Sequence, residues 1–523
     1  MRTGRPTTLG FNGMVATPHS LASAAGLAVL QDGGSAADAV IAANAVLTVI
    51  YPDQTSIGGD CFLIYHEAAT GTTHALNGSG RSPRAADRER LRALGHATMP
   101  RRGIHSVTVP GTIDAWFAIN ERFGRFGIDR LLAPAIAYAR DGFPVSPNLH
   151  ESLQHATSHH WLNEEFRSIY FPGGSAPKAG SRLRLPQLAA TLERIARDGR
   201  DVFYAGEVGE HIVETSRKLG GCFTEDDLTT HRAEWAEPVY ADYRGTTVAE
   251  FPPNSQGITA LIELNLAEQR PDAPWGTAEH LHPLIEAKKL AFNVRDQLLT
   301  DPAFATLDVQ KLVSKEFARE LWSEYDPRRA GAGRVSLAGD TVYLCAVDGE
   351  GNAASLIQSI YLDFGSGVLV DGIVLQCRGA YFSLSEDHPN RLEGGKRPLH
   401  TLMPAMLFRE GKLLGPIGTQ GGDAQAQVHL QLITNLVDYG MDPQQAIEAP
   451  RWVAGGSDPF AVGLEDRFPS ATIAGLAERG HQVSVTDPWN VHFGHAQMIL
   501  RDQESGLLMG GADPRADGVA IGH

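Results

Sequence analysis

The sequence has few of the features that mark disulfide-rich or metal-binding proteins. Its 523 residues include only 4 cysteines, all far apart: Cys61, Cys222, Cys345 and Cys377. With no C-x-x-C pair, this spacing argues against a disulfide framework or a zinc site and favours reduced, mostly buried thiols. The tightest histidine pair is His159-His160, but adjacent side chains point in different directions. We therefore expect neither a metal nor another cofactor.

Runs of basic residues and long apolar stretches are also missing. The formal net charge is -16, which argues against nucleic acid and anionic membranes as partners. The most apolar early stretch, residues 36–51, is short for a membrane span and contains Asp38 and Asn44, so it is typical of a buried helix. No apolar run suited to a signal peptide follows residues 1–10. These observations predict a cytoplasmic protein.

The pattern of elements predicts a mixed, layered fold. Residues 17–51 suggest two helices separated by Gly33-Gly34, and residues 280–299 suggest another. After about residue 340 the pattern changes to strands and hairpins, and Gly421-Gly422 opens a further helix. The strand-like segments are 341–347, 353–360, 372–382 and the hairpin 406–414. Helices together with antiparallel hairpins are typical of the α+β class.

Thr341 is the first candidate for chemistry. Gly339-Asp340 is a flexible, polar stop placed directly before a strand. If the bond after Asp340 were broken, Thr341 would carry a hydroxyl and a free α-amine whose pKa is ordinarily near 8, and this amine could act as the base for the hydroxyl. Taken alone, Thr341 is better explained as an ordinary β-branched strand residue.

The surrounding sequence gives Thr341 a context. Residues 341–367, TVYLCAVDGEGNAASLIQSIYLDFGSG, resemble the start of the small subunit of γ-glutamyltranspeptidases, with a leading Thr, a DGN-type turn and a strand ending in F-G-[ST]-G. Further blocks that resemble this family occur in order along almost the whole chain: Met14–Ala16, Asp32–Ala39, Gly58-Gly59, Val109–Gly111, Glu286–Phe292, Arg295-Asp296, Arg397–Leu399, Gly421-Gly422 and Asp513–Arg515.

The resemblance implies an N-terminal-nucleophile hydrolase with a four-layer αββα sandwich. It implies self-cleavage between Asp340 and Thr341, giving a large subunit of residues 1–340 and a small subunit of residues 341–523 that remain one intertwined domain. Ser359 matches a family hydroxyl near the nucleophile, and we expect it to orient Thr341; a plain strand serine is the alternative.

Gly421-Gly422 is expected to bind a developing oxyanion. Backbone N–H groups at a helix N-terminus carry partial positive charge, and glycine lets a substrate approach closely. This agrees with the role that the family resemblance implies. The alternative is a simple turn between a strand and a helix.

The chain departs from the transpeptidases where they hold the glutamyl group. Aligned on Pro83, Ser79 takes the place of their arginine, and Arg81 lies two residues later. Tyr361 stands where they have an asparagine, and the segment Arg378–Tyr381, which ends in Tyr381, stands where they have a Gln-Met-Asp-Asp run. His400-Thr401 replaces their paired serines. An ammonium needs a carboxylate partner, so γ-glutamyl compounds should fit poorly.

Arg378 suggests a different substrate. A guanidinium on an apolar strand is costly to bury unpaired. It needs either a substrate carboxylate, held by two hydrogen bonds, or a structural salt bridge to a nearby Asp or Glu. Several blocks around it resemble the oxamate amidohydrolases of this family. We therefore expect a small amide carrying a carboxylate, bound by Arg378, Tyr361, Tyr381, His400, Thr401, Arg81 and Ser79.

Other functions stay open from the sequence. The chain could be a γ-glutamyl hydrolase or transpeptidase that holds glutamate differently, or a member acting in antibiotic biosynthesis on an oxalyl C–C or amide bond. An inactive structural or binding role is the remaining class, and the retained Thr341, Ser359 and Gly421-Gly422 argue against it. The expected partners are the small-molecule substrate and the second subunit, and a homodimer is a further expectation.

Overall fold

The computed structural model describes residues 4–159, 161–333, 339–456 and 458–523, and two seven-stranded sheets organise it. All neighbouring strands in both sheets run antiparallel. The first sheet has the order β1 (Thr8–Gly10), β20 (Leu508–Ala512), β19 (Ala496–Arg501), β15 (Lys412–Thr419), β14 (Ala405–Arg409), β9 (Thr246–Glu250) and β8 (Val239–Tyr243).

The second sheet combines strands from both ends of the chain. Its order is β21 (Val519–Gly522), β2 (Gly13–Thr17), β10 (Asp340–Asp348), β11 (Ala353–Tyr361), β3 (Asp60–Glu67), β4 (Thr72–Gly78) and β7 (Glu234–Ala236). Strand β10 lies near its middle, hydrogen-bonded to β2 on one side and to β11 on the other. The N-terminal 340 residues and the remainder of the chain therefore both contribute strands to this sheet.

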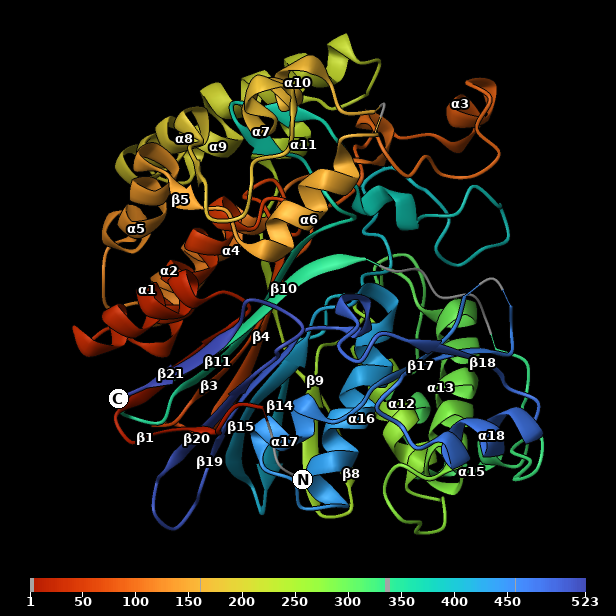
Figure 1. Ribbon diagram of the computed structural model, residues 1–523. Coiled ribbons are helices and arrows are strands. Elements are labelled where there is room, and N and C mark those ends of the chain that lie inside the picture. Colours follow the sequence, from red (N-terminus) through yellow and green to blue (C-terminus); the bar gives the residue numbers. More distant parts are fainter. Residues whose placement is uncertain (1–3, 160, 334–338, 457) are drawn as a thin grey trace.

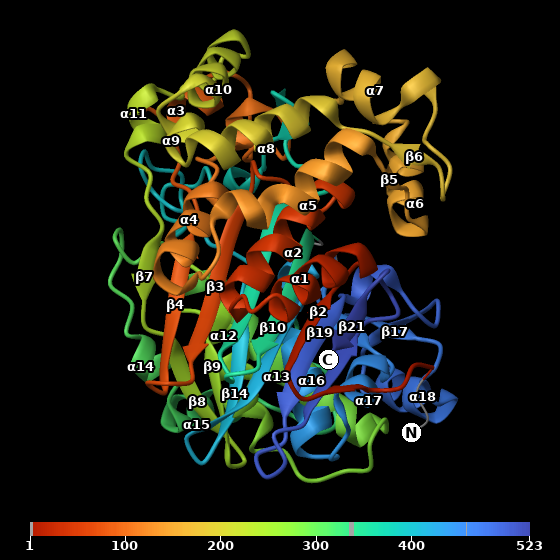
Figure 2. The same ribbon diagram turned by 90° about the vertical axis from the view of Figure 1, so that its left-hand side faces the viewer.

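Three apolar cores hold these layers together, and Figure 1 shows the sheets between two groups of helices. One core joins the second sheet to the helices that cover it, several of which are stacked in Figure 2: α1 (Ser20–Gln31), α2 (Ala36–Ile50), α4 (Thr112–Phe123), α5 (Ile128–Asp141) and α8 (Pro186–Asp198). Another joins the first sheet to helices including α12 (Gly257–Ala267), α13 (Ala278–Leu298) and α16 (Gln425–Val437). The third lies between the sheets and includes Met14, Phe62, Tyr343, Ile357 and Met406.

Shorter elements surround this framework. The remaining helices are α3 (Arg88–Ala93), α6 (Pro147–Ala156), α7 (Glu164–Tyr170), α9 (Asp201–Tyr204), α10 (Glu207–Lys218), α11 (Glu225–Thr229), α14 (Val309–Leu312), α15 (Lys315–Trp322), α17 (Pro443–Glu448) and α18 (Ser470–Glu478). The remaining strands are β5 (Phe143–Pro144), β6 (Arg182–Leu183), β12 (Leu369–Val370), β13 (Ile373–Val374), β16 (Trp452–Ala454), β17 (Ala461–Glu465) and β18 (Gln482–Thr486).

Helix α2 confirms the prediction of a buried helix. All of its residues are buried, and its first turn carries a capping box formed by Ser35 and Asp38. Asn44, the polar residue in its middle, donates to Gln358 at 3.1 Å and accepts from the indole of Trp116 at 2.8 Å. A buried amide satisfied in this way ties the helix to the strand beneath it. Among the described residues, none of the helices combines the length and the apolar character needed to span a bilayer.

The predicted strand over residues 372–382 is wrong. Only β13, Ile373–Val374, is extended, and the 3-10 helix η3 (Arg378–Tyr381) follows. The side-chain oxygen of Gln376 accepts a hydrogen bond from the backbone N–H of Arg378, which turns the chain out of the strand. The helix predicted at Gly421-Gly422 also needs adjustment, because the 3-10 turn η4 (Gly422–Ala424) precedes α16.

Candidate active site

Thr341 lies at the start of β10 and is 1% exposed. Its Oγ1 donates to the carbonyl oxygen of Asp340 at 2.6 Å and lies 3.2 Å from the Oγ of Ser359. Ser359 Oγ donates to the same carbonyl at 2.7 Å. Two hydroxyl groups therefore donate to the carbonyl oxygen of Asp340 and polarise it.

A break in strand register positions these hydroxyls. Asp340 pairs with Tyr361, whereas Val342 pairs with Gln358, so the β10–β11 ladder is irregular at Thr341. A bulge of this kind bends the strand locally and redirects a side chain. Tyr361 itself has a φ of 78°, an unfavourable left-handed conformation for a large residue. Its N–H donates to Ser359 Oγ at 2.7 Å, which fixes that hydroxyl.

The carboxyl group of Asp340 lies in acidic surroundings. Burial raises its pKa to about 8, and the nearby carboxylates of Asp363 and Asp53 add to the increase. Arg102 opposes this effect and forms an ion pair with Asp363. Asp340, the residue before Thr341, is therefore held as a neutral acid at moderate pH.

The Gly421-Gly422 turn lies at the same end of the molecule as Thr341. A Cβ atom at Gly418 of β15 would overlap the ring of Tyr343 in β10, so the two strands face each other closely. Gly421 and Gly422 have φ values of 134° and 55°, which favour glycine. Within the described part of the chain, neither backbone N–H donates a hydrogen bond. They are suitable donors for an oxyanion.

Residues that the sequence did not suggest hold this turn in place. Gln256 Nε2 donates to the carbonyl of Gly422 at 3.2 Å, and Arg295 Nη1 donates to Gln256 at 2.9 Å. Arg295 also pairs with Asp423 at 2.8 Å. The block Arg295-Asp296 belongs to the family resemblance, but it gave no indication of this role because Asp423 is distant in sequence.

Arg378, a predicted binding residue, lies beside Ser359. It is 1% exposed, donates to Thr401 Oγ1 at 3.0 Å and to Ser359 Oγ at 3.2 Å. Its guanidinium carbon lies 4.5 Å from the centre of the Tyr361 ring, a cation–π contact. Its Nε has no hydrogen-bond partner among the described residues. Burial lowers the pKa of Arg378, although Asp60 opposes that change.

Tyr381 connects Arg378 to the glycine turn. Its ring lies 5.3 Å from that of Tyr361, and its hydroxyl donates to the carboxylate of Asp423. Tyr361, Tyr381, Thr401 and Arg378 therefore form one continuous group next to the nucleophile.

His400 uses both ring nitrogens within the protein. Nδ1 accepts the N–H of Leu402 at 3.2 Å, so Nε2 carries the hydrogen and donates to Asp60 at 3.0 Å. Burial keeps the pKa of His400 well below its ordinary value and raises that of Asp60 to about 7. His400 is better suited to positioning the residues around it than to contacting a substrate.

Ser79 and Arg81 have other partners. The hydroxyl of Ser79 donates to Asn77 at 2.6 Å. Arg81 forms ion pairs with Asp301 at 3.0 Å and Glu234 at 3.1 Å, and its side chain is 33% exposed. Among the described residues, neither contacts Thr341 through a hydrogen bond, so the structure does not bring these two candidates to the nucleophile.

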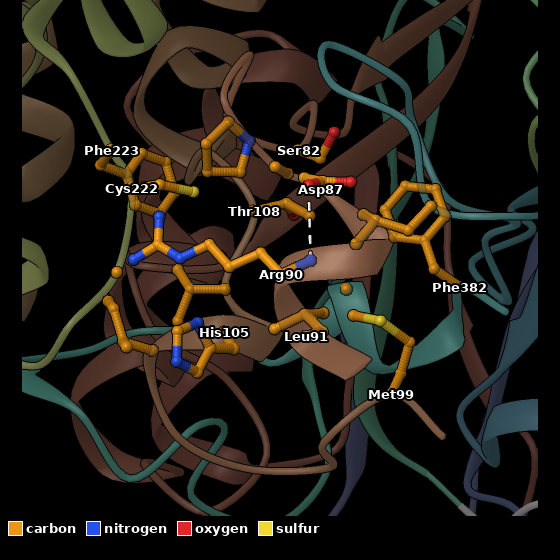
Figure 3. Close-up of a pocket in the computed structure, with 17 residues that line it drawn as sticks. Ser82, Asp87, Arg90, Leu91, Met99, His105, Thr108, Cys222, Phe223 and Phe382 are labelled. Carbon is orange, nitrogen blue, oxygen red and sulfur yellow. Dashed lines mark hydrogen bonds between the residues drawn. The ribbon is translucent and has the colours of Figure 1, made fainter. Parts of the chain in front are cut away.

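Two pockets adjoin this region. One, of about 80 Å³, is lined by Asp340 and Gln420 among others, and so borders both the start of β10 and the glycine turn. The other, of about 30 Å³, is largely apolar and borders η3 through Gly379 and Phe382 (Figure 3). Its lining also includes Leu91 and Met99.

The described residues offer one cluster with metal-ligand chemistry, His282, Glu286 and His481. His282 is hydrogen-bonded to His481 at 2.9 Å, and Glu286 pairs with Lys289 at 2.8 Å. An ammonium group in the cluster opposes a cation, so these residues do not fit a metal. Of the histidine pair considered above, His159 stacks on Trp161, and His160 lies outside the described residues.

Comparison with known proteins places the chain in a family. The sequence profile described as Gamma-glutamyltranspeptidase matches residues 22–523. The chain is 42% identical to the "Glutathione hydrolase-like YwrD proenzyme" of Bacillus subtilis and 38% identical to the "Oxamate amidohydrolase proenzyme" of Klebsiella pneumoniae, with 99% of each chain covered in both cases. A crystal structure of cephalosporin acylase from Bacillus halodurans superimposes with a TM-score of 0.95 at 38% identity, covering 100% of this chain and 98% of that one. The chain is a hydrolase that belongs to the γ-glutamyltranspeptidase family.

Proposed function

We propose that the chain is a proenzyme that cleaves itself between Asp340 and Thr341. The Thr341 hydroxyl attacks the Asp340 carbonyl, the C–N bond breaks, and the acyl group moves to oxygen as an ester while the α-amine of Thr341 is released. Water then hydrolyses the ester, which leaves a carboxylate on Asp340 and a free hydroxyl on Thr341. The 2.6 Å hydrogen bond from this hydroxyl to that carbonyl supports the first step.

The same hydroxyl then acts on substrate. The free α-amine of Thr341 takes the hydroxyl proton as the oxygen attacks an amide carbonyl, and Gly421-Gly422 stabilise the oxyanion. The proton passes to the leaving nitrogen as the C–N bond breaks, and water hydrolyses the resulting acyl-enzyme. Ser359, already bonded to the Thr341 hydroxyl, orients it throughout.

We infer that the acyl group is small and carries a carboxylate, as in oxamate. The observation that carries this inference is Arg378, buried beside the nucleophile with its Nε unpartnered among the described residues. Thr401 and the two tyrosines complete its surroundings. The carboxylates near this group are already engaged, Asp423 by Arg295 and Asp60 by His400, so a glutamyl ammonium would lack a partner.

The arrangement of helices and two sheets supports a further inference about the fold. Three successive cores separate helices, sheet, sheet and helices. We infer that this is the four-layer αββα sandwich of the N-terminal-nucleophile hydrolases, with residues 1–340 and 341–523 as its two subunits.

A comparison of wild type with Thr341→Ala and Thr341→Ser tests the proposal. On a denaturing gel the wild type should give two chains, the alanine variant one, and the serine variant two after slower cleavage. Purified wild type should release ammonia from oxamate and turn over γ-glutamyl anilides weakly. A single uncut wild-type chain that is active would refute the nucleophile, whereas strong γ-glutamyl turnover would refute only the acyl group.

A further inference from the structure

The pocket between Asp340 and Gln420 is built from polar side chains. Its volume of about 80 Å³ exceeds what one water molecule needs. Asp340 precedes Thr341 and Gln420 precedes the Gly421-Gly422 turn, so the pocket borders both the proposed cleavage site and the proposed oxyanion site. The rest of the lining comes from α2's C-terminal loop, α6 and the loop before β19: Gln54, Asn148, Glu151, Ser152, His155, Val491, His492 and His495.

Several buried atoms facing this region have no partner among the described residues. His495 is 3% exposed, and neither of its ring nitrogens has a hydrogen bond. The Oε1 atoms of Gln420 and Gln54 are likewise buried and unpartnered. Leaving a buried polar group without a hydrogen bond is unfavourable. Three such side chains around one pocket indicate a site that a polar ligand completes.

The character of these groups identifies the ligand. Both glutamine oxygens can only accept hydrogen bonds, and a neutral imidazole accepts through one nitrogen. Asp53, behind Gln54, has a buried carboxylate oxygen without a partner, and Glu151 adds a carboxylate on the exposed face of α6. An acceptor-rich pocket with carboxylates nearby favours a ligand that carries several N–H donors and positive charge.

We propose that this amine pocket, formed by Gln54, Glu151, Gln420 and His495, binds the nitrogen side of the substrate and selects leaving amines that bear a second, ammonium group. The inference rests on the proposed function, because it takes Thr341 as the nucleophile. Arg378 then holds the acyl carboxylate, while the C–N bond breaks and the departing amine, having taken its proton from the Thr341 α-ammonium, donates to the acceptors of the pocket.

Two amides with one acyl group test the selection. N-(2-aminoethyl)oxamate and N-propyloxamate have similar length and differ in the terminal ammonium. The wild type should favour the aminoethyl compound in kcat/KM by about tenfold, as one charge-assisted hydrogen bond would give. Glu151→Gln should reduce this preference several-fold, and His495→Phe should remove most of it. Glu210→Gln, an exposed change on α10 outside the pocket, should leave it unchanged.

The outcomes separate the two proposals. Equal rates for the two amides in the wild type would overturn the amine pocket and leave amide hydrolysis intact. If neither amide nor oxamate is hydrolysed, the acyl group is wrong, and ligand-observed NMR of the cleaved protein with 1,2-diaminoethane then tests the pocket alone. Binding that weakens in Glu151→Gln but not in Glu210→Gln supports the pocket, whereas no binding overturns it. Since Glu151 is exposed, its variant does not depend on repacking the interior.

Discussion

Arg378 carries a positive charge in a site from which water is almost excluded. Its guanidinium is held by the hydroxyls of Thr401 and Ser359 and by the face of Tyr361. Hydroxyls and a ring compensate a buried cation less completely than a carboxylate does. The substrate carboxylate that we propose would supply the missing charge, which is why the residue should affect binding more than folding.

Replacing Arg378 tests this role. Arg378→Lys keeps the charge but loses the planar fork, and Arg378→Met loses both. We expect KM for a carboxylate-bearing amide to rise about tenfold in the first and about a hundredfold in the second, since a charged hydrogen bond contributes about 1.5–3 kcal/mol. Steady-state kinetics would measure both. Arg81→Gln is the matched control because Arg81 is paired elsewhere; an equal rise there would argue against a binding role specific to Arg378.

Asp340 makes the stability of the uncut protein depend on pH. Its pKa is about 8 in the folded protein against an ordinary 3.8. A raised pKa means that the folded state binds the proton more tightly, so this contribution to stability is complete below about pH 4 and is lost as pH rises towards 8.

The Thr341→Ala protein, which keeps the bond intact, allows the measurement. In that background Asp340→Asn has no proton to lose. Its melting temperature should therefore rise relative to that of the Thr341→Ala parent between about pH 5 and about pH 8, because the parent's free energy of unfolding falls by up to about 1.4 kcal/mol per pH unit. Thermal unfolding at three pH values is sufficient. A difference in melting temperature that stays constant with pH would show that Asp340 titrates normally.

At this scale the sequence predicted the residues whose role is local. Thr341 and Ser359 were identified because a strand, a polar stop and a family pattern lie around them, and both hydroxyls lie within hydrogen-bond distance of the Asp340 carbonyl. The predicted contacts of Arg81 and His400 with the substrate rest on alignment and on the donors that an oxalyl-like group needs. Their real partners, Asp301 and Asp60, are hundreds of residues away in sequence, and no local pattern indicates such pairs.

Among the elements, η3 and the glycine turn are connected by a side-chain hydrogen bond. Tyr381 at the end of η3 donates to Asp423, which follows Gly422, and Arg295 of α13 pairs with the same carboxylate. The glycine turn that we propose as the oxyanion site is thus held from two sides, by Tyr381 and by Arg295. Pre-organised donors of this kind are effective because they need not reorganise during the reaction.

Tyr381→Phe removes one of these restraints. We expect kcat to fall about tenfold with little change in KM, because the turn becomes less ordered while the Arg378 group remains. Tyr439→Phe is the control, since the Tyr439 hydroxyl donates to the carbonyl of Ala273 at 2.9 Å, away from the site. Kinetics with oxamate would report both. A rise in KM without a fall in kcat would assign Tyr381 to substrate contact instead.

Element prediction succeeded where periodicity was strong and failed where a side chain turned the backbone. Helix α2 and strands β10 and β11 follow their apolar patterns closely. Residues 372–382 are equally apolar, but Gln376 accepts a hydrogen bond from the backbone two residues later and ends the extended conformation. Hydrophobicity alone does not distinguish a buried strand from a buried turn of this kind.

For the whole molecule, the placement of the strands determines what cleavage can release. In the second sheet β2 lies between β21 and β10, and β11 pairs with β3, so strands from both parts of the chain are neighbours. In the first sheet β20, β19, β15 and β14 lie between β1 and β9. The ladder between β10 and β2 spans the proposed subunits. Separating the two parts would expose the core between the sheets.

We therefore expect the cut protein to behave as one particle. Size-exclusion chromatography of the cleaved wild type and of Thr341→Ala should give the same elution volume, while a denaturing gel separates two chains only in the former. Chemical unfolding of the cleaved protein should also be a single transition, because both parts contribute to each core. Elution of two smaller species without denaturant would contradict the proposed subunit arrangement.

The family could be recognised from sequence because its ordered blocks extend over nearly the whole chain, and the matched range of residues 22–523 agrees. Substrate class could be narrowed only through charge, by noting an arginine where relatives use other groups. The amine pocket was not predicted. Its walls come from segments around residues 54, 151, 420 and 495, and their convergence depends on how two sheets pack.

The hydroxyl of Thr341 and the carbonyl that it touches are neighbours in one chain. Maturation by this route is a first-order event, so its half-time is independent of how concentrated or dilute the polypeptide is, and newly made copies need no encounter with older ones. Each copy would cleave itself once, at a time set only by when the strands around β10 come together.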